Sequence, residues 1–333
     1  MKKELSFLWI DDEPSRTDFA DSLGRHSKYG YKAKIDFVSL KNKNVVDELG
    51  LIRKLKQPDL IIIDHVFNKI AKENVIREGS TTAELIKEGW PSCPIVCVTG
   101  VRKKLHITLN KRASYEDIFI DDDLLNHYDS LFILAHDFRL LLKNNNRNTI
   151  QLMDLLKPPI DDKGRLESCM PQEIKFMDDG QPIRFFKWVH DEIFNRPGFL
   201  YSKLWAATFV GVKEDSFTKV ERALGEARYS GVFADYDGPR WWGTKIKEII
   251  YKRISSPRPI PTWELGRDLP KLTRRDYSMC CVCKKNNPPP ETVGYVDVES
   301  NEAKPMHLRC SVAHPRYQKR LYFDEIRMIK PAE

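Results

Sequence analysis

The sequences LSFLWIDDE (residues 5–13) and LIIID (residues 60–64) decide the fold of the N-terminal part of the chain. Each is a largely apolar run, interrupted in the first only by Ser6, that ends in acidic side chains. Continuous apolar runs, rather than alternating ones, are typical of strands buried on both faces of a parallel sheet. In such a sheet, functional groups gather where the strands end. The two stretches therefore predict buried parallel strands with an acidic cluster at their carboxyl ends.

Three further segments have the character of strands, and helical patterns lie between them. The strand candidates are residues 33–38, 94–98 and 117–120, and the helical patterns include residues 82–88 and 131–142. Regular alternation of strands and helices is typical of α/β folds. The sequence thus predicts an α/β domain with a doubly wound parallel sheet over residues 1–143.

The middle of the chain is predicted to be a second domain. After a connecting region, residues 144–181, helical patterns follow at residues 183–194, 199–209, 216–228 and 244–254. The aromatic segments 231–233 and 240–242 flank the turn-rich sequence DYDGP, which favours a β-hairpin. Three helices and then a hairpin are the order of a winged helix. We therefore expect residues 182–254 to form a winged-helix-like α+β domain.

Four side chains are expected to meet where the predicted parallel strands end: Asp11, Asp12, Asp64 and Thr99. Three converging carboxylates repel one another, and a hard cation such as Mg²⁺ relieves that repulsion through oxygen ligands. One carboxylate beside the cation could accept a phosphoryl group, and the threonine hydroxyl could hydrogen-bond the added oxygens. The alternative is that these aspartates only cap helix N-termini or solvate loop ends.

These motifs resemble the receiver domain of two-component response regulators, which has a flavodoxin-like fold. The matching pieces are the Asp11-Asp12 pair, Asp64 after DLIII, and Thr99 in PIVCVTG. The resemblance implies that Asp11, Asp12 and Asp64 hold Mg²⁺, that Asp64 is the phosphoacceptor, and that Thr99 is the switch residue. It also implies a histidine kinase, or another signalling protein, as a partner.

The sequence departs from the receiver pattern after the fifth strand. The family has a lysine there, which neutralises the phosphoryl group, whereas this chain has Asp121 directly after Ile120. An anion at that place disfavours an aspartyl phosphate. The stretch after Asp64 is also longer than the usual loop. We therefore expect weak Mg²⁺ binding and poor phosphorylation, as in pseudo-receivers.

The C-terminal cysteines have the spacing of a zinc site. Residues 255–278, which begin SSPRPIP, are predicted to be an extended linker to a zinc module at residues 279–333. Cys280-x2-Cys283 and His307-x2-Cys310 would complete a tetrahedral, closed and structural Zn²⁺ site. A predicted strand at residues 292–298 and helix at residues 308–321 resemble treble-clef zinc modules. Cys281 and His314 are spare candidate ligands, and idle thiols are the alternative.

Positive charge is concentrated between residues 239 and 285. This stretch has twelve basic and four acidic residues, whereas the whole chain has a net charge of +7. Basic residues between tryptophans can contact nucleic-acid phosphates. The candidates are Lys219, Arg222, Arg240, Lys245, Arg274 and Arg275. An ordinary solvated face is the alternative, because the predicted recognition helix, residues 216–228, is barely basic.

Composition restricts the class of protein. Of the 333 residues, 41% are hydrophobic, which is enough to form folded cores. No window approaches the roughly 20 apolar residues of a membrane span, so we expect a cytoplasmic protein. The seven cysteines are then not a disulfide framework.

The sequence therefore predicts an atypical response-regulator-like signalling protein that is not an enzyme. Its output domains would bind DNA or a partner protein. One alternative is a protein-binding adaptor with a degenerate receiver domain, and a weaker one is a zinc-finger-type nuclease. The oligomeric state is left open.

Overall fold

The computed structural model describes the greater part of the chain as two compact units. The described residues are 4–23, 30–72, 76–100, 109–120, 124–143, 148–195, 198–253, 269, 271–284, 292–296, 303–307, 310–313 and 327–329. The first unit comprises residues 1–148, 171–187 and 235–237, and the second comprises residues 149–170, 188–234 and 238–333. The chain therefore returns twice to the first unit after residue 148. The finer domain boundaries expected from the sequence stay a prediction.

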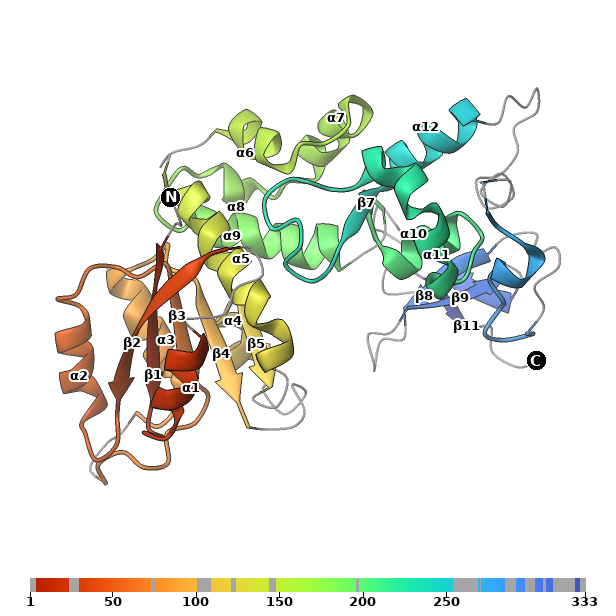
Figure 1. Ribbon diagram of the computed structural model, residues 1–333. Helices are drawn as coiled ribbons and strands as arrows, with labels where there is room; N and C mark the ends of the chain where they lie inside the picture. Colours follow the sequence, from red (N-terminus) through yellow and green to blue (C-terminus); the bar gives the residue numbers. More distant parts are fainter. Residues whose placement is uncertain are drawn as a thin grey trace. The chain divides into compact units, whose positions relative to one another are not determined.

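A five-stranded parallel sheet forms the centre of the first unit (Figure 1). Its strands lie in the order β2 (Lys32–Ser39), β1 (Glu4–Asp11), β3 (Leu60–Asp64), β4 (Ile95–Thr99) and β5 (Asp117–Ile120). All neighbouring pairs are parallel. The predicted doubly wound sheet is confirmed, and each strand lies within two residues of the range expected from the sequence.

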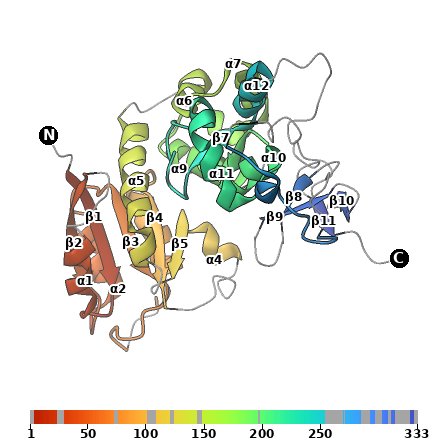
Figure 2. The same cartoon turned by 45° about the vertical axis from the view of Figure 1, so that its right-hand side comes forward.

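Helices cover both faces of this sheet. They are α1 (Arg16–Leu23), α2 (Val45–Ile52), α3 (Gly79–Gly89), α4 (Leu109–Ala113) and α5 (Leu124–Leu142). Because side chains alternate along a strand, Leu8 and Ile10 share a core with α2 and α3, whereas Phe7 faces α5. The rings of Phe7 and Phe132 of α5 are 5.3 Å apart, and α5 runs along one face of the sheet (Figure 2). Burial on both faces explains why the central strands β3 and β4, and β1 from Phe7 to Ile10, are continuously apolar, whereas the edge strand β2 alternates.

The second unit is helical, with a small two-stranded sheet. Its helices are α6 (Thr149–Leu156), α7 (Ile160–Cys169), α10 (Lys203–Phe209), α11 (Glu214–Glu221) and α12 (Gly243–Arg253). Two short helices whose residues up to 187 belong to the first unit, α8 (Gln172–Lys175) and α9 (Gln181–Trp188), precede a π-helical turn of the second unit at Val189–Phe194. The supposed connecting region is thus mostly helical. Trp241 is fully buried in the core of this unit, and its ring lies 4.9 Å from that of Phe217.

The predicted β-hairpin is wrong. β7 (Arg240–Trp242) pairs antiparallel with β6 (Leu200–Ser202), and not with residues 231–233. Phe233 has a left-handed φ of 61°, which interrupts an extended strand, and the Val232 N–H donates to the carbonyl of Leu155. Residues 199–202, expected to be helical, are instead mainly the strand β6. The described residues thus form a helical region with a two-stranded sheet, and a winged helix is not shown.

The C-terminal residues that the structure describes form a four-stranded sheet. Its order is β10 (Ser311–Ala313), β11 (Arg327–Ile329), β8 (Thr292–Val296) and β9 (Ala303–His307). β8 was predicted as a strand, but the helix expected over residues 308–321 is wrong at residues 311–313, which are extended. Most of the predicted linker, residues 255–268, lies outside the described residues.

Among the described helices, none combines the length and apolarity that crossing a membrane requires.

Candidate functional site

Three carboxylates converge at the carboxyl end of the parallel sheet. Asp11 is the last residue of β1, Asp12 follows it, and Asp64 is the last residue of β3. One oxygen atom from each lies within 4.8 Å of the other two. Asp11 is 0% and Asp12 is 4% exposed, whereas Asp64 is half-buried, so this acid pocket is open to solvent only on the Asp64 side. Thr99, 2% exposed, ends the adjacent strand β4.

The carboxylate of Asp11 is held by three groups. Its Oδ1 accepts a hydrogen bond from the backbone N–H of Glu13 at 2.8 Å. Its Oδ2 accepts one from the indole N–H of Trp9 at 3.3 Å and lies 3.2 Å from a guanidinium nitrogen of Arg16. Asp11 is therefore positioned by its own strand and by the start of α1.

Asp12 is held by the loop that follows β3. Its carboxylate accepts a hydrogen bond from the backbone N–H of Lys69, and the ammonium group of Lys69 pairs with Glu13. Sequence reasoning missed both Arg16 and Lys69. The available signal for Arg16 was its position five residues after Asp11 with a proline between them, because Pro14 favours a turn that brings the chain back.

Burial and mutual repulsion disfavour ionisation in the acid pocket. Burial, reinforced by the nearby charge of Asp11, raises the pKa of Asp64 to about 7. Burial also raises the pKa of Asp11, although the guanidinium of Arg16 opposes that shift. A divalent cation would reverse this unfavourable balance by neutralising the carboxylates.

Solved structures with a similar fold are response-regulator proteins. A two-component response regulator from Clostridium difficile is 22% identical, with 43% of this chain and 99% of that chain covered and a TM-score of 0.29. A CheY-like receiver domain protein from Methanospirillum hungatei is 15% identical, with coverage of 42% and 99% and a TM-score of 0.30. Identity is low and covers less than half of this chain, so the fold assignment rests on the strand order β2-β1-β3-β4-β5, which flavodoxin and CheY share. The first unit, the receiver-like domain, has this fold. No family model matches the sequence, and no curated protein matches it either.

The donor set of the receiver-like domain fits Mg²⁺. Three carboxylates are hard oxygen ligands, and a small cation that keeps several waters needs few ligands from the protein. The roles implied for Asp11, Asp12 and Asp64 as Mg²⁺ ligands therefore agree with their placement. Asp121, predicted to oppose a phosphoryl group, lies outside the described residues.

The long stretch after Asp64 forms an arm that folds back along itself. Val66 and Glu78 pair as an antiparallel bridge, and the N–H of Phe67 donates to the carbonyl of Arg77. Phe67 and Ile70 are 1% and 6% exposed, because they pack into the core beside α2 and α3. This anchoring fixes the arm and places the Lys69 amide on Asp12. The extra length is thus part of the acid pocket.

Gly79 closes this arm directly against Asp64. Its N–H donates to the carbonyl of His65 at 2.8 Å. A Cβ atom at this position would lie 2.0 Å from the backbone oxygen of Asp64. Only glycine allows the two backbones to approach so closely.

The pKa of Asp64 predicts how Asp64→Asn changes stability with pH. In Mg²⁺-free buffer the folded protein holds the Asp64 proton up to about pH 7, whereas the unfolded chain loses it near pH 4. Folded-state stability is therefore lost as the pH rises through this window. Asparagine has no proton to lose, so we expect Asp64→Asn to become more stable relative to the wild type as the pH rises. At pH 8 this relative gain in the free energy of unfolding should be on the order of 2–4 kcal/mol. Urea denaturation at pH 5 and pH 8 measures this, and an equal difference at both values would contradict it.

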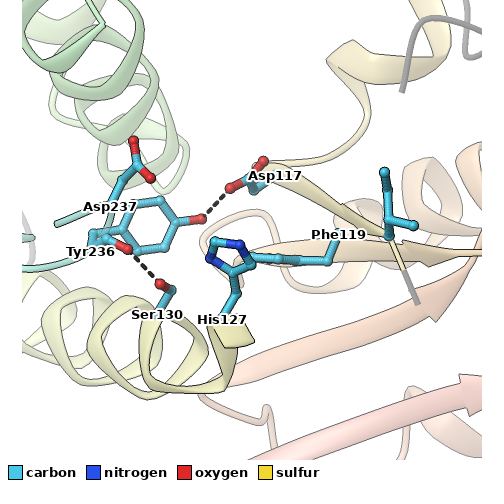
Figure 3. Close-up of a pocket in the computed structure, with 7 residues that line it drawn as sticks. Asp117, Phe119, His127, Ser130, Tyr236 and Asp237 are labelled. Atoms are coloured by element: carbon cyan, nitrogen blue, oxygen red, sulfur yellow. Dashed lines mark hydrogen bonds between the residues drawn. The ribbon is translucent and has the colours of Figure 1, made fainter. Parts of the chain in front are cut away.

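A pocket beside β5 is lined in part by Tyr236, a residue from far along the chain (Figure 3). Tyr236 is 2% exposed, and its hydroxyl donates to Asp117 Oδ2 at 2.7 Å. Its backbone carbonyl accepts a hydrogen bond from the hydroxyl of Ser130, and its ring meets Phe186 edge-on at 5.6 Å. These contacts explain why residues 235–237 belong to the first unit.

The Tyr236→Phe variant is expected to lose about 1–2 kcal/mol of unfolding free energy, because the half-buried carboxylate of Asp117 loses a hydrogen-bond donor. Urea denaturation followed by circular dichroism measures the loss. Tyr251→Phe is a matched control, because Tyr251 is 36% exposed and its change is expected to stay within about 0.5 kcal/mol. Equal effects of the two substitutions would show that the bond to Asp117 contributes nothing.

Three of the four predicted zinc ligands come together. The sulfur atoms of Cys280, Cys283 and Cys310 lie within 4.8 Å of one another. The Lys284 N–H donates to the carbonyl of Cys280 at 3.0 Å, and Lys284 has a φ of 57°, so a tight turn joins the first two thiols. Desolvation raises the pKa of Cys310 to about 11, and the hydrogen bonds that its S–H donates to Cys280 and Cys283, with the negative charge of these two groups, add to the shift.

This Cys triad, defined by those three residues, fits Zn²⁺, because thiolates on a tight turn are its usual structural ligands. His307 has its backbone in β9, but its side chain lies outside the described part of the chain, as does His314. Cys281 is not in the triad. The fourth ligand therefore stays a prediction.

The candidate nucleic-acid contacts do not share one environment. Arg240 is 3% exposed and its guanidinium stacks on Phe194 at 4.3 Å, so it is buried in the structure, and its contact with phosphate stays a prediction. Lys219 lies 2.6 Å from a carboxylate oxygen of Asp276, and Lys245 lies 2.6 Å from one of Glu248. Arg222, Arg274 and Arg275 are exposed.

Proposed function

We propose that the chain is a response-regulator-like signalling protein in which Asp64 accepts a phosphoryl group with the help of Mg²⁺. The observation that carries this proposal is the convergence of Asp11, Asp12 and Asp64 at the carboxyl end of the sheet, with Thr99 on the next strand. A histidine kinase would be the natural donor for such a domain. Regulation rather than catalysis is the role that this pocket supports.

The chemistry assigns a separate task to each side chain. A carboxylate oxygen of Asp64 attacks the phosphorus of a donor such as acetyl phosphate; an O–P bond forms, the donor's P–O bond breaks, and acetate leaves with the electron pair. Mg²⁺, when bound, supplies positive charge against the phosphoryl oxygens. Asp11 and Asp12 hold that ion, and the Thr99 hydroxyl donates a hydrogen bond to the transferred group. The acidic residue Asp121 leads us to expect a slow reaction.

Labelling with acetyl phosphate tests this function. The intact protein is incubated with Mg²⁺ and the donor, and a mass increase of one phosphoryl group on Asp64 is the expected result. Asp64→Asn should remove the increase, and omission of Mg²⁺ should suppress it. Modification of Asp64→Asn at the wild-type rate, or no modification of the wild type, would overturn the proposal.

The output partner is proposed to be a protein rather than DNA. The observation that favours a protein is that Arg240 is buried, while Lys219 and Lys245 are paired with carboxylates. The alternative is that the second unit contacts nucleic acid. In that case the exposed residues Arg222, Arg274 and Arg275 would make the contacts.

Titration of random duplex DNA at low and moderate salt separates the two partners. If the output partner is a protein, no DNA binding is expected at low salt, where the attraction between basic side chains and DNA phosphates is strongest. A DNA-binding output predicts a steep salt dependence, with a slope of about −0.9 per neutralised phosphate. In that case, replacing Arg274 and Arg275 together with alanine should flatten the slope by up to about two units.

A further inference from the structure

Arg16 occupies an electrostatically unfavourable position at the start of α1. It is the first residue of this eight-residue helix, and a turn in which its N–H donates to the carbonyl of Glu13 at 3.1 Å precedes it. A cation is disfavoured at a helix N-terminus, because the helix dipole is positive there. The helix therefore does not favour an arginine at this position, whereas the negative charge of the acid pocket does.

The guanidinium of Arg16 points into the acid pocket. One of its nitrogens lies 3.2 Å from Asp11 Oδ2, and the arginine side chain is 19% exposed, whereas that of Asp11 is 0% exposed. A pair so far removed from water is only weakly screened. The same positive charge partly offsets the rise that burial gives the pKa values of Asp11 and Asp64, so its field reaches beyond its immediate partner.

We propose that Arg16 is an internal competitor of the divalent cation, and that it sets the Mg²⁺ affinity of the acid pocket. A cation that coordinates Asp11 must share this carboxylate with the guanidinium or displace it. The bound ion would also lie close to a like charge, and a like charge at such a distance typically weakens binding of a cation by tenfold or more. Binding of Mg²⁺ is therefore coupled to movement of the Arg16 side chain away from Asp11.

This inference rests on the proposed Mg²⁺ site and adds a residue that controls it. Arg16 is a positioning residue, because it acts through Asp11. In the absence of the ion it would hold Asp11 and partly compensate the pocket charge, so the receiver-like domain stays folded without metal. The pocket would then respond only to Mg²⁺ concentrations high enough to displace the arginine.

Isothermal titration of the full chain with MgCl₂, at fixed ionic strength and pH 8, tests the inference. Arg16→Gln is expected to bind Mg²⁺ at least about tenfold more tightly than the wild type. Arg16→Lys keeps the charge and should stay closer to the wild type. Lys34→Gln is the matched control for net charge, because Lys34 lies on β2 with its side chain 69% exposed, paired with Asp36; its affinity should stay within about twofold.

The outcomes distinguish this inference from the proposed function. Unchanged or weaker binding by Arg16→Gln, with clear binding by the wild type, would overturn the role of Arg16 and leave the Mg²⁺ site standing. Binding by neither protein up to about 20 mM would overturn both, because Arg16→Gln removes the competing charge. An equal gain in Mg²⁺ affinity in Arg16→Gln and Lys34→Gln would show that the effect comes from the net charge of the protein, and this would also overturn the inference. Thermal melts of all variants in Mg²⁺-free buffer verify that each is folded.

Discussion

The Cys283→Ser variant is expected to purify without the zinc ion that the wild type carries, about one per chain. Cys283 contributes one of the three sulfur atoms that lie within 4.8 Å of one another. Structural zinc contributes about 10–16 kcal/mol of apparent binding free energy in small zinc modules, and this energy is coupled to their folding. A serine oxygen is a poor substitute for a thiolate, so both the metal and the local fold should be lost.

Two measurements follow the zinc prediction. Metal analysis by mass spectrometry gives the zinc content, and limited proteolysis should show new cleavage between residues 279 and 313 in the variant. Cys281→Ser is the matched control, because Cys281 is the neighbouring cysteine outside the Cys triad. We expect it to keep its zinc. A wild-type protein without zinc, or equal losses in both variants, would refute the site.

Gly79→Ala is expected to destabilise the receiver-like domain by on the order of 2–3 kcal/mol. The added methyl group would lie 2.0 Å from the backbone oxygen of Asp64, and backbone atoms cannot yield as a flexible side chain can. Asp64 would have to move, so the geometry of the acid pocket should change with it. We therefore expect Gly79→Ala to lose Mg²⁺ affinity as well as stability.

Gly50→Ala is a close control for this substitution. Gly50 lies within α2, and nothing is within 4 Å of the Cβ atom that an alanine would add there. Alanine is a better helix former than glycine by about 1 kcal/mol, so Gly50→Ala should stabilise the protein slightly. Urea denaturation of both variants, with Mg²⁺ titrations, measures the contrast. If Gly79→Ala is as stable as the wild type, the close approach to Asp64 is not required.

The fold of the first unit could be predicted because its strands are buried on both faces. Residues 7–10 and 60–63 are continuously apolar for that reason, and the acids at their ends mark the carboxyl edge of the sheet. Asp11, Asp12 and Asp64 could therefore be placed together without coordinates. The Cys triad was predictable for a similar reason, because a two-residue spacing in a tight turn brings Cys280 close to Cys283.

The second unit was harder to predict, because its pairing is not local. β7 pairs with β6, some forty residues earlier in the chain, and no pattern in either three-residue strand identifies its partner. The aromatic residues around DYDGP are there for burial: Trp241 and Tyr236 are both among the largest fully buried side chains. Arg16 and Lys69 were missed because their roles depend on a turn and an arm whose paths the sequence does not reveal.

The return of residues 235–237 to the first unit has a consequence for synthesis of the chain. Translation proceeds at roughly 5–20 residues per second, and about 90 residues separate Asn148 from Asp237. The pocket beside β5 therefore stays without Tyr236 for roughly 5–20 s after the sheet has been made. During that interval the edge strand β5 and the side chains of Phe119 and Ser130 lack their later neighbour, so this is the stage at which a ribosome-associated chaperone could protect them.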